Sequence, residues 1–204
     1  MAQRCHGEQP PQSRVGLSFG AFRTRLVFAE RGFLDLEELA AGVSFERRLS
    51  KQVTLQLSGG GIGYARLGGP AAETLRGFFA GAGVSWSVLD QKGAIPFVMI
   101  GLALAGSLAV PGRGGDDALY AFDLRGSVTA GYTLAKRWTP YLVGRLFGGP
   151  AFLAERGRTY VGTDVWHFQL GAGLVVGLPG GFDLSAELVP LGEQRVSAGL
   201  GYAF

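Results

Sequence analysis

The sequence predicts an all-β protein, a single antiparallel up-and-down transmembrane β-barrel of about ten strands, with eight strands as the alternative. Apolar residues alternate with small or polar residues along most of the chain, which is the periodicity of strands with two different faces. The 204 residues include 35 glycines, which weaken helix interiors but save volume in curved sheets. The longest run free of charge and of strong polarity, residues 93–106, is too short for a spanning helix of roughly 20 apolar residues.

The last stretch of the chain, residues 194–204, shows the alternation most simply. Its even-numbered residues from Val196 to Phe204 are apolar, and Arg195 begins the opposite row of small or polar residues. A free edge strand that exposes Tyr202 and Phe204 to water would invite aggregation. A strand whose apolar face contacts lipid, and which pairs with the first strand to close a barrel, avoids that problem. Its parity therefore predicts that Val196 faces lipid and that Arg195 faces the lumen.

Five strands are expected in the first half of the chain, at residues 14–22, 36–46, 52–64, 75–88 and 94–109. Alternating apolar residues define the first four, whereas the fifth is apolar on both faces. Residues 23–35, which are rich in charge, and residues 65–74, which contain Gly-Gly-Pro, are expected as long loops. Residues 47–51 and 89–93 are expected as tight turns.

Five more strands are expected in the second half, at residues 118–134, 138–152, 164–178, 182–189 and 194–204. Residues 110–117, with a Pro-Gly-Arg-Gly-Gly-Asp-Asp core, and residues 153–163 are expected as loops. Residues 135–137, 179–181 and 191–193 are expected as short turns. Short turns on one side and longer loops on the other are typical of a barrel with periplasmic turns and extracellular loops. The short connection at residues 191–193 departs from this layout.

The chain divides into a tail and one domain. Residues 1–13 are polar and contain Pro10-Pro11, which predicts a disordered periplasmic N-terminal tail before a barrel at residues 14–204. The only cysteine, Cys5, lies in the tail, so no internal disulfide is expected. No signal peptide is recognisable at the N-terminus, which for an exported protein indicates a mature form.

Aromatic residues recur at the strand ends beside the short turns, and a girdle at the periplasmic interface is the expected role of such residues. The girdle residues are Phe45, Trp86, Tyr132 and Trp138.

The terminal Tyr202-x-Phe204, the turn from Tyr132 to Trp138-Thr139-Pro140-Tyr141 and the Gly-rich alternation resemble the small outer-membrane β-barrel proteins of Gram-negative bacteria, the OmpA/OmpW/opacity-like group. The resemblance covers residues 14–204. It implies a bacterial outer-membrane location, contact with outer-membrane lipid and lipopolysaccharide, and recognition by the barrel assembly machinery, with Tyr202 and Phe204 as the assembly signal. The best-known members of the group have eight strands, so ten strands depart from its pattern.

Polar residues gather on the face opposite to lipid, mainly in the second half of the chain. Because charges away from water are normally paired, they predict an internal hydrogen-bond and ion-pair network, and a narrow polar path or ligand cleft is the alternative. The expected lumen residues are Glu38, Asp123, Arg125, Arg145, His167, Gln169, Glu187 and Arg195.

Three functions remain open from the sequence: a structural or narrow small-solute pore, an anchored binding protein that acts through its extracellular loops, and a rim enzyme acting on lipid or peptide. The enzyme would use His167 as a base with Asp123 or Glu187, but no hydroxyl nucleophile stands at matching height. A net charge of +3 without a basic block argues against a nucleic-acid partner. No enzyme activity, metal or cofactor is expected, and a monomer is expected.

Overall fold

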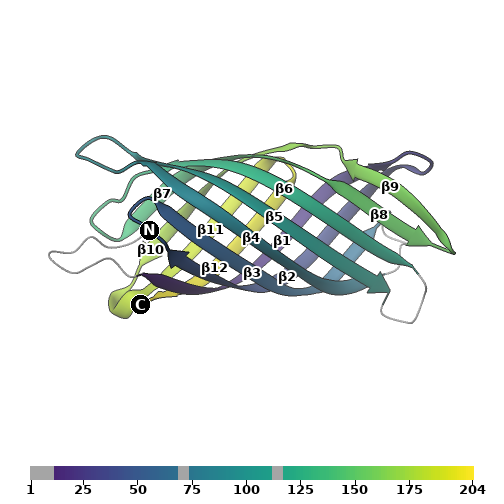
Figure 1. The fold of residues 1–204 in the computed structure, drawn as a ribbon, viewed down its shortest axis with the longest axis horizontal. Coiled ribbons are helices and arrows are strands. Elements are labelled where there is room, and N and C mark those ends of the chain that lie inside the picture. The colour runs from purple at the N-terminus through teal and green to yellow at the C-terminus, as the bar shows by residue number, and fades with distance from the viewer. Residues whose placement is uncertain (1–11, 69–73, 112–116) are drawn as a thin grey trace.

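Twelve strands form one closed sheet in the computed structural model, which describes residues 12–68, 74–111 and 117–204 (Figure 1). No helix among these residues is long and apolar enough to cross a membrane. The strands are β1 (Ser13–Phe28), β2 (Gly32–Arg48), β3 (Val53–Leu67), β4 (Thr74–Leu89), β5 (Phe97–Pro111), β6 (Ala118–Gly131), β7 (Trp138–Gly148), β8 (Pro150–Glu155), β9 (Arg158–Asp164), β10 (Phe168–Gly177), β11 (Phe182–Gly192) and β12 (Gln194–Ala203).

Ten of these strands confirm the predicted barrel. They follow the order β12-β11-β10-β7-β6-β5-β4-β3-β2-β1, and β1 closes the sheet by pairing with β12. The seam runs from Arg14 opposite Ala203 to Arg23 opposite Gln194. It ends in reciprocal backbone hydrogen bonds of 3.0 and 2.9 Å between Ser13 and Phe204. The chain's first and last strands therefore satisfy each other's edges, which leaves no open edge at this seam.

The barrel has two different ends. At the terminal end, Ser13 meets Phe204 and short turns follow β2, β4, β6 and β10. At the hairpin end, β8 and β9 continue beyond the ends of the last strands (Figure 1). Of the N-terminal tail expected at residues 1–13, residues 1–11 lie outside the described residues, and Ser13 begins β1.

The prediction of a loop at residues 153–163 is wrong, because these residues form part of the barrel wall. The hairpin of β8 and β9 pairs on one side with β6, over Ala118–Ala121, and on the other with β1, over Leu26–Phe28. The sheet therefore closes with eight strands at the hairpin end and ten at the terminal end. The β11–β12 hairpin is short and β9 passes beyond it to reach β1, which explains the short connection around Gly192.

Two glycines allow this rearrangement. A Cβ on Gly149, between β7 and β8, would overlap the carbonyl oxygen of Phe122. Gly192, at the β11–β12 turn, has φ +83° and would overlap the carbonyl oxygen of Phe168 in the same way. Only glycine fits such close backbone approaches, so both bends depend on these residues.

The prediction of a first long loop at residues 23–35 is also wrong. Strands β1 and β2 pair without a break until Phe28 stands opposite Gly32, and only residues 29–31 form the turn. The charged residues stay in the strands and pair on the outer surface, as Arg25 does with Asp35 at 2.7 Å. The alternation therefore continues, with most of the charged residues outside and mainly leucine and phenylalanine inside.

The outer wall of the barrel is apolar. Leu17, Leu142 and Leu146 are 50%, 65% and 71% exposed, and their strand neighbours in sequence face the lumen. Val196 on β12 is 52% exposed, whereas Arg195 faces inward, as the parity of the last stretch predicted. Water-soluble monomers rarely expose so continuous an apolar surface.

Candidate functional site

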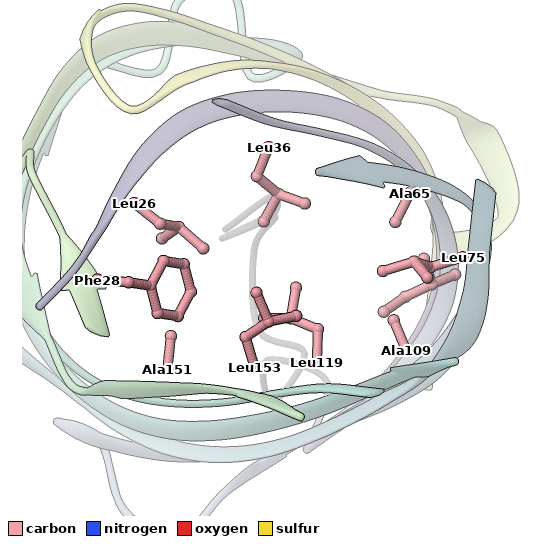
Figure 2. Close-up of a cluster of buried hydrophobic side chains, with 10 residues drawn as sticks. Leu26, Phe28, Leu36, Ala65, Leu75, Ala109, Leu119, Ala151 and Leu153 are labelled. Atoms are coloured by element: carbon pink, nitrogen blue, oxygen red, sulfur yellow. The ribbon is translucent and has the colours of Figure 1, made fainter. Parts of the chain in front are cut away.

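The lumen is filled by apolar side chains at the hairpin end (Figure 2). Phe28 is 1% exposed, Ile62 2% and Ala65 0%, and seven strands contribute side chains to this cluster. Tyr160, from β9, packs against it. We call the cluster the apolar seal; its members are Leu26, Phe28, Leu36, Ile62, Ala65, Leu75, Ala109, Leu119, Ala151 and Leu153.

The seal was not predicted from the sequence, because several of the expected strands ended too early. Leu26, Phe28 and Leu153 were assigned to loops, yet each points into the barrel, and Figure 2 shows their side chains converging. The signal was available: Leu26 and Phe28 continue the inward parity of the first strand. At this end the small or polar inner row gives way to large apolar residues.

Below the seal, on the side of the terminal end, lies a polar network centred on Arg145. Arg145 donates hydrogen bonds to Glu187 at 2.8 Å and to Gln169 at 3.3 Å. The Tyr141 hydroxyl donates to the same Glu187 oxygen at 3.0 Å. Three neighbouring strands, β7, β10 and β11, therefore hold one cation, one carboxylate and their polar partners together, which offsets the cost of burying the charges.

The network continues toward the seal through Gln169, which is 2% exposed and donates to Glu193. Arg125 forms an ion pair with Asp123 at 2.7 Å and lies 3.9 Å from Glu193. Its guanidinium also lies 4.8 Å from the centroid of the Phe147 ring. One oxygen of Asp123 is buried without a hydrogen-bond partner among the described residues.

Arg195 and Glu38 stand on the two sides of Phe22, which pairs with both in the strand register. Arg195 interacts electrostatically with Arg145 and Glu187, and Glu38 with Glu193 and Arg195. Seven of the eight expected lumen residues are thus brought together beneath the seal.

His167 is the exception. Its side chain is exposed in the connection between β9 and β10, so it is not a buried member of this network, and its place in the lumen stays a prediction. Its carbonyl oxygen accepts a hydrogen bond of 3.0 Å from the backbone N–H of Phe147, which continues the pairing of β10 with β7 past Phe168. Because His167 does not join Asp123 or Glu187, the geometry gives no support to a catalytic base.

A second polar group lies at the terminal end and was not expected from the sequence. Arg14 donates to Asp183 at 2.6 and 2.9 Å and to Glu46 at 2.9 Å. These side chains come from β1, β11 and β2, on both sides of the closing seam. Arg14 shares the inward face with Gly16, but its partners depend on the strand order.

The wall formed by β1 to β5 is lined by small side chains. Ser18 and Gln56 face inward but are exposed, so solvent reaches the lumen at this level. Phe79 lies against Gly42 and Gly60, where a Cβ would overlap its ring. The ring therefore lies along the wall instead of across the lumen. We call this accessible region, between the seal and the terminal end, the vestibule.

The tips of the hairpins are held together outside the lumen. Arg31, in the β1–β2 turn, donates a hydrogen bond to Glu155 on β8 and lies 4.9 Å from the centroid of the Tyr160 ring. The hydrogen bond from Arg31 holds the pKa of Glu155 below its ordinary value. This contact fastens the β8–β9 hairpin to β1 beyond the apolar wall.

The expected girdle and assembly residues lie at the terminal end. Phe45, Trp86 and Trp138 are 38%, 40% and 49% exposed, and the Tyr132 hydroxyl donates to the carbonyl oxygen of Gly93. The rings of Tyr202 and Phe204 stack with centroids 5.9 Å apart, and Phe182 lies 4.9 Å from Tyr202. Their roles as girdle and assembly signal remain predictions. The described residues contain no group of three His, Cys, Asp or Glu that could hold a metal ion.

No family model and no curated protein sequence matches the chain. Solved structures of similar fold are outer-membrane barrels. The translocator domain of the autotransporter NalP from Neisseria meningitidis aligns with a TM-score of 0.52 at 13% identity, over 95% of this chain and 89% of that one. The outer-membrane protein OprG from Pseudomonas aeruginosa aligns with a TM-score of 0.49 at 10% identity, over 96% and 97%. At these identities the likeness shows the fold alone.

Proposed function

We propose that the chain is an integral β-barrel of a bacterial outer membrane, with its terminal end toward the periplasm. Its polar vestibule admits small solutes, and its apolar seal blocks the free passage of ions. The single observation that carries this function is the seal, which crosses the lumen with side chains from seven strands. The apolar outer wall supports the membrane location, since such a surface is stable in lipid and aggregates in water.

The seal opposes ion flow for two physical reasons. An ion that enters an apolar constriction loses its hydration without gaining a partner, which costs several kcal/mol or more. A narrow apolar segment also expels water and closes a pore by dewetting. The charged side chains below the seal are largely paired with one another, so they stabilise the wall and tune which solutes enter.

Reconstitution tests this function in two steps. The purified protein should require detergent or lipid to stay monodisperse, and it should migrate differently on a detergent gel before and after boiling. In planar bilayers, the folded barrel should show no sustained ion conductance. A protein that is monomeric and stable without detergent would refute the membrane location, and a steady open channel would refute the closed seal.

The loop-binding alternative loses its main basis, because residues 23–35 and 153–163 belong to strands except for the short turns at residues 29–31 and 156–157.

A further inference from the structure

An apolar groove of about 590 Å³ lies on the outer wall of the barrel, over the closing seam. Five strands contribute one outward residue each to its lining, and these residues are neighbours in the register: Leu188, Val196, Ala21, Leu39 and Tyr64. Leu188, Val196 and Leu39 are 58%, 52% and 53% exposed. The small Ala21 at the centre of this row makes the wall concave between larger neighbours.

Charged residues border the groove on the side of the hairpin end. In the next outward row, Gln194 stands opposite Arg23, Arg23 opposite Glu37, and Glu37 opposite Arg66. We call Arg23, Arg25 and Arg66 the arginine belt. With Asp35 and Glu37 it carries three positive and two negative charges, a net charge of 3 − 2 = +1.

Arg23 is the belt arginine that makes no hydrogen bond to a carboxylate among the described residues. Its nearest carboxylate oxygens, on Asp35 and Glu37, are 3.7 and 3.8 Å away, which is beyond hydrogen-bond length, and its side chain is 58% exposed. Arg25 and Arg66 neutralise those same carboxylates at 2.7 and 2.6 Å. Arg23 is therefore held beside the groove by charge while its guanidinium can still donate to a ligand.

We propose that the groove and the arginine belt form one site for the lipid A part of lipopolysaccharide, with an acyl chain in the groove and a phosphate on Arg23. The proposal rests on the proposed function, which turns the hairpin end toward the outer leaflet, where lipopolysaccharide is the phosphorylated lipid. A guanidinium pairs with phosphate in a bidentate geometry, and the net positive belt disfavours release of the anion. Apolar surface directly below a cationic row matches an acyl chain below a phosphorylated headgroup.

Native mass spectrometry of the folded protein in detergent micelles tests the site. Purified lipid A is the probe, phosphatidylglycerol is the competing anionic lipid, and phosphatidylethanolamine is the zwitterionic control. The native barrel should retain one lipid A molecule at concentrations where neither phospholipid stays bound. The variant R23Q/R66Q should weaken lipid A retention at least tenfold, since it removes the charged donors at the rim.

Two further variants separate the site from general charge. R48Q/K51Q removes the same charge at the terminal end, outside the groove, and should retain lipid A like the native protein. A21F fills the outward-facing groove and should also weaken retention, with the gel shift on boiling unchanged. Equal loss in R23Q/R66Q and R48Q/K51Q, or equal retention of lipid A and phosphatidylglycerol, would overturn the proposal. Failure of the native protein to fold in micelles would instead overturn the proposed function.

Discussion

Truncation of Phe28 in the apolar seal should cost the barrel much of its stability. The side chain is 1% exposed and packs in the lumen against the β8–β9 hairpin. Loss of the buried ring removes about 2 kcal/mol of transfer free energy. A cavity on the order of 100 Å³ adds about 2.4 kcal/mol at ~24 cal/mol per Å³. Phe28→Ala should therefore lower the free energy of unfolding by about 4 kcal/mol.

The assay is urea unfolding in lipid vesicles, followed by the fluorescence of the protein's three tryptophans. Phe33→Ala is the matched control, because Phe33 lies in the same hairpin but is 66% exposed. It should change the unfolding free energy by about 0.5 kcal/mol or less. The double variant F28A/L153A should also admit water and give measurable ion conductance. Equal costs for Phe28→Ala and Phe33→Ala, or a folded double variant as silent as the native barrel, would refute the seal.

Three other outcomes follow from the geometry. Gly149→Ala should abolish the gel shift on boiling, since its Cβ would overlap a carbonyl oxygen, whereas Gly61→Ala, whose Cβ has its nearest neighbour at 3.9 Å, should keep it. Arg145→Gln should destabilise the barrel by about 3–5 kcal/mol in urea unfolding, because it leaves the buried Glu187 without its cation. The double variant R145Q/E187Q should recover part of this loss. As pH falls through the lowered pKa of Glu155, its contribution to the hairpin contact is lost, so the protection factors of amides at the tip, which are corrected for the intrinsic exchange rate at each pH, should fall. The variant E155Q should show low protection at every pH.

Parity predicted the faces of the strands well. The period-two pattern needs no knowledge of strand partners, so it placed Val196 outward and Arg195 inward and predicted ten strands around the barrel. It also identified Arg125, Arg145 and Glu187 as lumen residues, because each lies among residues of one inward row.

Properties that depend on strand order were not predictable in the same way. The pairing of Arg14 with Asp183 joins residues far apart in sequence, and β9 reaches β1 only because the β11–β12 hairpin is short. Charge in residues 23–35 predicted a loop, since a charged outward row resembles solvated coil until its cross-strand partners are known. The expected loop also concealed the seal, although the inward parity of Leu26 and Phe28 continues that of the first strand.

The most direct test of the central claim is a single-cysteine scan along the inward row of β6, in a Cys5→Ser background. Ser127 lies in the vestibule and Leu119, 5% exposed, lies in the seal. With the barrel in lipid vesicles, a small water-soluble thiol reagent should label S127C readily. It should fail to label L119C from either side of the membrane until the protein is unfolded. Rapid labelling of L119C in the folded barrel would contradict a sealed lumen.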